Sequence, residues 1–173
     1  ELCEHGFPLT AEHYRIPFVY PLIYLGDFLV IYNQNVINIS LYNYIGGRQM
    51  FEYTDIKTAP AALGPYSQAV MAGNTLYASG AIGIDPETGK FAGEDVQSQC
   101  EQACKNVGEI LKANGMTYDN VVKTTCYILD MAEFKDFNEV YAKYFTSKPA
   151  RSCVAITALP AGALCEVEII AVK

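Results

Sequence analysis

The chain has 173 residues, of which 51% are hydrophobic and 18% charged, and its formal net charge is −7. This length and composition exclude a disordered chain and are typical of one globular domain whose core needs no disulfide staples. The negative charge and the lack of clustered Lys and Arg disfavour nucleic-acid binding, because phosphate contacts need such clusters.

Residues 1–49 differ in composition from the rest of the chain. They are rich in Tyr, Ile, Asn, Leu and Phe and show no sustained period of 2 or 3.6. A membrane anchor over residues 16–32 is one interpretation, but this stretch is interrupted by prolines and is short for a span. The composition also resembles translated AT-rich noncoding DNA, and Gly46-Gly47-Arg48 could come from a ribosome-binding site. We therefore predict that the natural protein starts at Met50 and that residues 1–49 are an extension, foreign to it or poorly ordered.

From Met50 onward the pattern is regular, and residues 50–173 are expected to form the functional domain. Residues 51–54 predict a short strand, and residues 58–66 a loop bracketed by two prolines. Residues 68–71 and 75–79 alternate around the turn sequence Ala72-Gly73-Asn74, which predicts a hairpin. A polar turn is expected at residues 85–90.

Two helices are well marked. Apolar residues recur every three or four positions from Val96 to Leu111, and Gly115 follows where a left-handed cap is needed. An apolar stripe over residues 134–145 predicts the second helix, after a capping-box pattern that begins at Asp130. Strands are predicted at residues 120–129, 151–156 and 164–172, the last two separated by a turn at residues 160–162.

This order of elements predicts an α+β fold in which a mixed sheet of about six strands carries both helices on one face. The other face has polar residues among apolar strand positions, namely Gln68, Thr75, Lys123 and Glu166. Such a surface fits a subunit interface better than open solvent, so we expect a symmetric homo-oligomer.

The thiols and imidazoles limit the chemistry. The cysteines lack the density of a secreted disulfide-rich domain, so we expect reduced thiols in a cytoplasmic protein. Cys100 and Cys104 would share a helix face, but without a second pair or a nearby histidine we expect helix packing and no metal site. His5 and His13 are the only histidines, so chemistry after residue 50 would run without imidazole.

Arg151 is the only arginine after Met50, whereas nine lysines occupy the same region. A guanidinium is a planar fork of donors that fits a carboxylate in bidentate fashion, and lysine cannot imitate it. Arg151 is therefore a candidate to bind the carboxylate of a small substrate. The alternative is a structural ion pair with one of the many Asp and Glu residues.

Other candidates lie near the closing strands. Glu166 and Glu168 have period-2 spacing, so they share one face of a strand, which is either partly buried and able to raise a carboxyl pKa or turned to solvent. Cys153 would share the face of Arg151, but without histidine it is a weak nucleophile. Asn138 interrupts the aromatic helix stripe, and we interpret it as a surface or cap position.

Three candidates precede the first helix. Tyr66 follows a Gly-Pro turn that would direct its phenol into a cleft, and Ser79 with Gly80 could present backbone groups at a strand end.

Five segments in order resemble the signature of the Rid (YjgF) family, and more narrowly its RidA branch of reactive-intermediate deaminases. They are Ala59-Pro60-Ala61-Ala62-Leu63-Gly64-Pro65-Tyr66-Ser67-Gln68, Ala78-Ser79-Gly80, Val121-Val122-Lys123-Thr124-Thr125, Pro149-Ala150-Arg151-Ser152-Cys153-Val154 and Glu166-Val167-Glu168. The resemblance runs from about Met50 to Lys173 and leaves residues 1–49 without a counterpart.

The resemblance implies a chorismate-mutase-like homotrimer with active sites in clefts between subunits. It implies hydrolysis of 2-imino or enamine acids, such as 2-iminobutanoate and 2-iminopropanoate, to 2-keto acids and ammonia without a cofactor, on substrates released by pyridoxal-phosphate dehydratases. Arg151 would bind the substrate carboxylate and Glu166 would orient or activate water. Tyr66 would line the cleft, Gly80 and neighbouring Ser79 would offer backbone contacts, and the main chain of Cys153 would face the imine nitrogen.

Two alternatives to this function remain at the level of sequence. A regulatory trimer could bind 2-keto acids without turnover, although a sensor would need only Arg151 and not Glu166. An RNA-acting protein is disfavoured by the charge of residues 50–173, where ten basic residues face fifteen acidic ones for a net −5. The link at residues 145–149 looks shorter than in several relatives, so substrate preference is left open.

Overall fold

The computed structural model describes residues 22–25, 28–31, 41–43 and 51–173, and it divides the chain into two units, Glu1–Arg48 and Gln49–Lys173. In the first unit, strands β1 (Leu22–Leu25), β2 (Phe28–Ile31) and β3 (Leu41–Asn43) form an antiparallel sheet. The sequence did not predict these strands, because this segment lacks a clear period. Our predictions about the two histidines, a start at Met50 and an anchor fall largely or wholly outside the described residues. No helix in the part of the chain that the structure describes could cross a membrane.

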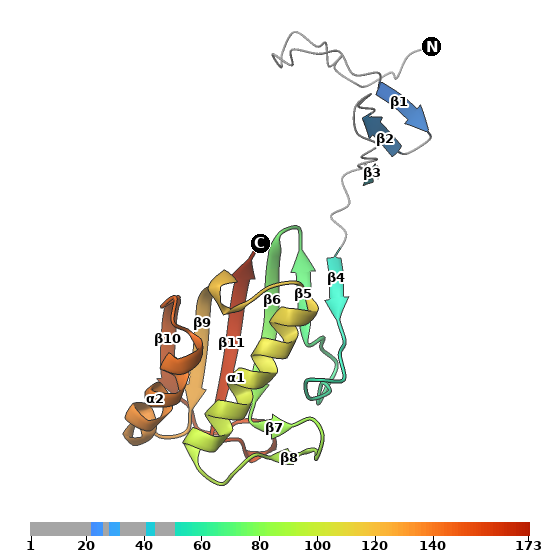
Figure 1. Ribbon diagram of the computed structural model, residues 1–173. Coiled ribbons are helices and arrows are strands. Elements are labelled where there is room, and N and C mark those ends of the chain that lie inside the picture. The colour runs from blue at the N-terminus through green and yellow to red at the C-terminus, as the bar shows by residue number, and fades with distance from the viewer. Residues whose placement is uncertain (1–21, 26–27, 32–40, 44–50) are drawn as a thin grey trace. The chain divides into compact units, whose positions relative to one another are not determined.

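The second unit is built on a six-stranded mixed sheet in the order β10-β9-β11-β6-β5-β4 (Figure 1). Only the β10–β9 pair is parallel, and the other neighbours are antiparallel. The strands are β4 (Phe51–Thr54), β5 (Ala69–Ala72), β6 (Thr75–Ile82), β9 (Val121–Ile128), β10 (Ala150–Ala155) and β11 (Cys165–Val172). At either end of the predicted polar turn, β7 (Ile84–Asp85) and β8 (Lys90–Phe91) pair to form a further small hairpin.

Local signals fix the ends of helix α1 (Val96–Ala113). The Asp95 side chain accepts a hydrogen bond from the Ser98 N–H, and this satisfies a donor that has no partner within the helix. Gly115 follows with φ +66°, the left-handed conformation that the sequence predicted. Gly73, with φ +63°, makes the turn of the β5–β6 hairpin in the same way.

The start of α2 (Phe134–Tyr144) differs from the prediction. Asp130 accepts from the Ala132 N–H and caps the 3₁₀ turn η2 (Met131–Glu133), and α2 itself begins at Phe134 without a side-chain cap. The capping-box pattern therefore marks a turn that leads into the helix. Another 3₁₀ turn, η3 (Pro160–Gly162), lies between β10 and β11 where the turn was predicted, and η1 (Tyr118–Asn120) precedes β9.

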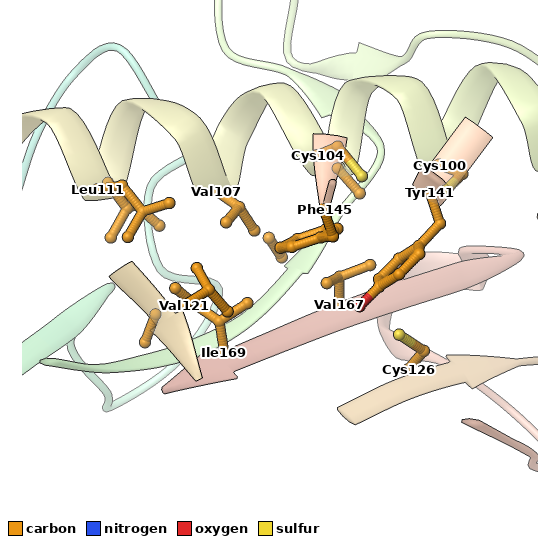
Figure 2. Packing of buried hydrophobic residues seen from close by; sticks show 14 of the residues in the cluster. Cys100, Cys104, Val107, Leu111, Val121, Cys126, Tyr141, Phe145, Val167 and Ile169 are labelled. Carbon is orange, nitrogen blue, oxygen red and sulfur yellow. The ribbon is translucent and has the colours of Figure 1, made fainter. Parts of the chain in front are cut away.

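Both helices cover the same face of the sheet, as predicted (Figure 1). Cys104, Val107 and Leu111 of α1 lie over Val167 and Ile169 of β11 (Figure 2). The side chains pointing to the helices alternate along β11 with half-buried ones on the other face. This period-2 alternation assigns each strand residue to the helix face or to the open face.

The open face carries apolar side chains. The strand register aligns Tyr53, Val70, Tyr77 and Ile170 in one row across β4, β5, β6 and β11, and Tyr53 and Tyr77 are 68% and 51% exposed. Thr75, Lys123 and Glu166 share this face, as expected. Gln68 does not, which corrects our prediction, because its buried side chain bonds the backbone of Ile56, Ala59 and Pro60 and so anchors the preceding loop.

The described cysteines are free thiols, and four of the five are buried in the core. Cys100 and Cys104 share the inner face of α1, and contacts with Cys104 and burial raise the pKa of Cys100. Cys100 donates weakly to the Phe137 carbonyl. The described ranges hold no group of three or more His, Cys, Asp or Glu arranged around a metal ion.

Candidate active site

Arg151 lies on the helix face of β10, at the edge of the sheet. Its Cα is in register with Thr124, a fully buried residue of β9, so the two side chains point the same way. The guanidinium Nη1 donates to Asn138 Oδ1 at 2.7 Å, and the guanidinium carbon lies 4.7 Å from the Tyr141 ring centroid and 5.6 Å from that of Phe134. An amide and two aromatic faces therefore hold the arginine in place.

No carboxylate among residues 51–173 lies within ion-pair distance of Arg151. The ion pairs of this region join Lys105 to Glu101, Lys112 to Glu109 and Lys135 to Glu139. Arg151 instead lines an open cleft of about 330 Å³ with Tyr141 and Lys148. Of the two sequence interpretations, the structural ion pair is not seen within these residues, and the guanidinium keeps donors for a carboxylate from outside.

Cys153 shares the face of Arg151 and lies opposite Cys126. Burial raises the pKa of the Cys153 thiol, and the nearby Arg151 opposes this shift only in part. The thiol therefore stays protonated at neutral pH, which disfavours a nucleophilic role. The Ile156 N–H donates to the Ile128 carbonyl, and by strand alternation the backbone N–H and C=O of Cys153 point away from β9. These main-chain groups lie on the outer edge of the described sheet.

Glu166 lies on the opposite, open face of the sheet. Its Cα pairs with Ile82 of β6 and with Tyr127 of β9. Its side chain lies across Gly80, so that a Cβ at position 80 would overlap the Glu166 carboxyl group. Burial, followed by the negative charge of Glu168, raises the pKa of Glu166. Of the two alternatives for the strand face that carries Glu166 and Glu168, the structure therefore shows the partly buried one and not a face fully turned to solvent.

Ser79 and Gly80 form a bulge in β6. The ladder between β6 and β11 shifts register at this point, and Ser79 lies within the strand rather than at its end. The Ser79 N–H donates to the Gln68 carbonyl at 3.0 Å, and its hydroxyl donates to the Ser67 carbonyl at 2.7 Å. Our prediction that Ser79 and Gly80 lie at a strand end is therefore wrong. The Ser79 N–H is already bonded, and this residue anchors the loop that carries Tyr66.

Tyr66 joins this group, as the Gly-Pro turn predicted. Its half-exposed phenol folds back so that its oxygen accepts from the Leu63 N–H at 3.0 Å. A cleft of about 240 Å³ opens here, lined by Leu63, Tyr66, Ser79, Gly80, Ile82, Pro160 and Glu166. The cleft has apolar walls and a single carboxylate.

The predicted residues thus fall into two groups in one chain. Arg151 and Cys153 lie on the helix face at the edge strand β10, whereas Tyr66, Ser79, Gly80 and Glu166 line the cleft on the open face. Strand β9 separates β10 from β11 in the sheet. Arg151 and Glu166 therefore do not meet within one chain.

Asn138 is the residue that sequence reasoning underestimated. We interpreted it as a surface or cap position, but its side-chain oxygen accepts from Arg151. Its polarity within the aromatic stripe of α2 was the available signal. That stripe alone does not reveal that α2 packs over the edge strand that carries Arg151.

Comparison with known proteins gives consistent matches over this domain. The sequence profile of the family described as Endoribonuclease L-PSP matches residues 56–173. Reactive Intermediate Deaminase A, chloroplastic, from Arabidopsis thaliana is 54% identical over 121 residues, which cover 69% of this chain and 65% of the plant protein. The 2-iminobutanoate/2-iminopropanoate deaminase of Mus musculus is 50% identical over 116 residues, covering 66% of this chain and 86% of the mouse protein.

Solved structures agree with these matches. RidA from the Antarctic bacterium Psychrobacter superposes with a TM-score of 0.68 at 39% identity, covering 70% of this chain and 99% of that one. E. coli TdcF, solved with bound serine, has a TM-score of 0.68 at 36% identity, covering 70% and 98%. The chain therefore belongs to the Endoribonuclease L-PSP family, and this confirms the resemblance of its motifs to the Rid (YjgF) proteins and their RidA branch.

Proposed function

We propose that this protein hydrolyses reactive 2-imino and enamine acids, such as 2-iminobutanoate and 2-iminopropanoate, to 2-keto acids and ammonia. The observation that carries the proposal is that relatives 54% and 50% identical to this chain are named reactive-intermediate and 2-iminobutanoate/2-iminopropanoate deaminases. The positions of Arg151 and Glu166 in two open clefts support it, because one residue fits a substrate carboxylate and the other a water molecule.

The working site is formed by two copies of the chain, each giving one group of residues. Arg151 and Glu166 lie on opposite faces of their own sheet, so a substrate held by both must touch two subunits. The row formed by the exposed Tyr53 and Tyr77 with the half-buried Ile170 supports association through the open face. Contacts between different faces form a closed ring when the rotation between subunits closes, and the homotrimer that the family resemblance implies is such a ring.

The reaction needs few groups once the substrate is held. Arg151 binds the carboxylate, and the Cys153 backbone lies beside the imine nitrogen. Glu166 accepts a proton from water while the oxygen attacks the iminium carbon, which gives a tetrahedral aminoalcohol. Glu166 then returns the proton to nitrogen and, again a carboxylate, takes the hydroxyl proton as the C–N bond breaks. The keto acid and ammonia leave, and the proton passes from Glu166 to ammonia, which becomes ammonium. No electron transfer or carbanion arises, so the reaction requires no cofactor.

Two other functions find less support. A regulatory keto-acid-binding trimer would not need a half-buried carboxylate beside an open cleft. RNA cleavage, which the family description names, would have to proceed on a domain of net charge −5 without histidine after residue 50. A cytoplasmic location remains part of the proposal, supported by the free thiols of the described region, whereas the Arabidopsis relative is named chloroplastic.

The assay couples the purified protein to threonine dehydratase and follows 2-ketobutyrate. We expect ketobutyrate to form faster with the wild type than by uncatalysed hydrolysis, and Arg151→Ala to lose this acceleration. No acceleration by the wild type, or an equal one by the variant, would reject the proposed function. Salt-dependent RNA retention by a highly purified sample would favour the RNA-acting alternative.

A further inference from the structure

A second carboxylate, Glu168, lies beside the proposed proton acceptor Glu166. The two residues are separated by Val167, whose side chain is fully buried on the helix face, so both carboxylates project from the open face. Across the ladder to β9, Glu166 pairs with Tyr127 and Glu168 with Thr125. They are therefore neighbours along the same strand face.

The bulge in β6 brings the two glutamates into one electrostatic environment. Val167 pairs with Ala81 and Ile169 with Ala78, so the single residue Glu168 faces both Ser79 and Gly80. Gly80 has no side chain, and the Glu166 side chain occupies the space above it. Glu166 thus turns toward the same stretch of β6 that lies opposite Glu168, and the half-burial of both residues limits screening by water.

No cation of residues 51–173 neutralises this pair. Neither glutamate takes part in an ion pair there. Lys123, the lysine of β9 on this face, donates to Ser152 Oγ at 3.0 Å and so points toward β10. The other ionisable groups are the phenols of Tyr127, Tyr66 and Tyr77, whereas β6 and η3 offer no charged side chain.

We propose that Glu168 is a positioning residue of the deaminase, whose negative charge strengthens Glu166 as a proton acceptor in the cleft. This inference rests on the proposed function and adds a residue that does not itself touch the substrate. In agreement with it, Glu168 is the charge that raises the pKa of Glu166 after burial, and burial followed by the charges of Glu168 and Glu166 raises the pKa of Tyr127. A stronger base accepts the water proton more readily. It also becomes protonated at a higher pH, so the activity of the enzyme falls earlier as the solution is acidified.

The test is the pH profile of kcat/KM for the full-length protein and three variants. Imino acid is generated by a dehydratase in excess at every pH, and uncatalysed hydrolysis is subtracted. For Glu168→Gln, the acid limb is expected to move to lower pH, so that the ratio of kcat/KM on this limb to its plateau rises about twofold or more. Plateau kcat falls at the same time, because Glu166 is then a weaker base.

Two controls separate charge from structure. Glu168→Asp keeps the charge and is expected to keep the wild-type acid limb. Glu87→Gln removes the same charge from an exposed turn and is expected to change nothing. A Glu168→Gln acid limb that coincides with the wild type, or one shared by Glu168→Asp, overturns the inference while leaving the deaminase intact. Absence of wild-type acceleration would reject the proposed function itself.

Discussion

Glu166 lies across Gly80, in the space that any side chain at position 80 would fill. A bulge in one strand therefore decides where the carboxylate of the neighbouring strand points. The Glu166 carboxylate can take this orientation only because residue 80 of β6 has no Cβ.

Gly80→Ala should lower kcat by about ten- to hundredfold, because the new methyl group pushes the Glu166 carboxylate out of position. When Gly80→Ala is added to Glu166→Gln, kcat should fall by less than about threefold further, since the positioned base is already gone. Steady-state kinetics of the four proteins gives this cycle, with thermal unfolding to verify folding. Equal losses in both backgrounds would show that Gly80 acts independently of Glu166.

Arg151→Lys should raise KM about ten- to hundredfold, because an ammonium keeps the charge but loses the bidentate fork. We expect kcat to fall less than it does for Glu166→Gln. The comparison uses substrate saturation curves for both variants. A wild-type KM for Arg151→Lys would show that charge alone binds the substrate.

Changes at Asn138 should act through Arg151. Asn138→Ala removes the hydrogen-bond acceptor and should raise KM about three- to tenfold. Asn138→Asp places a carboxylate against the guanidinium, where it competes with the substrate carboxylate, so its KM should rise further. The inhibition constant of a 2-keto acid should rise in the same order, from the wild type to Asn138→Ala to Asn138→Asp, and it measures carboxylate binding apart from turnover. If Asn138→Asp binds better than Asn138→Ala, the proposed competition is wrong.

Arg151→Ala and Glu166→Gln should complement each other when their subunits are mixed. If the site lies between subunits of a ring, about a quarter of the sites in a random mixture combine an intact Arg151 group with an intact Glu166 group. The subunits are unfolded and refolded together, and activity is compared with each variant refolded alone. As a control, each single variant is refolded with the double variant Arg151→Ala/Glu166→Gln, which cannot supply the missing residue and should restore no activity. Activity no greater than the average of the separate variants would place both residues in one chain.

Cys153→Ala should change kcat/KM by less than about threefold, because the side chain is a small half-buried thiol and the proposed contact is main-chain. Burial raises the pKa of this thiol, so iodoacetamide should modify it slowly at neutral pH. Labelling is followed by intact mass. A hundredfold loss in Cys153→Ala, or rapid labelling that abolishes activity, would indicate thiolate chemistry.

Local chemistry made much of the fold predictable. Gly73 and Gly115 adopt the positive φ values that their turn and cap require, and the spacing of Val96, Cys100 and Val107 gives α1 its buried stripe. These signals depend on neighbours within a few residues. The Ser79–Gly80 bulge escaped prediction, because pairing with the distant strand β11 creates it. The β7–β8 hairpin escaped because each of its strands has only two residues, too few to show a period.

The sequence by itself determined the family, and after residue 50 it showed one arginine, two glutamates at period-2 spacing and no histidine. Only the tertiary structure decided that Asn138, Tyr141 and Phe134 hold Arg151 and that Gly80 makes room for Glu166. It also put Arg151 and Glu166 on opposite faces. The physical reason is that alternation along a strand is local, whereas the register and order of strands, and the helix that packs on each face, are set by long-range packing.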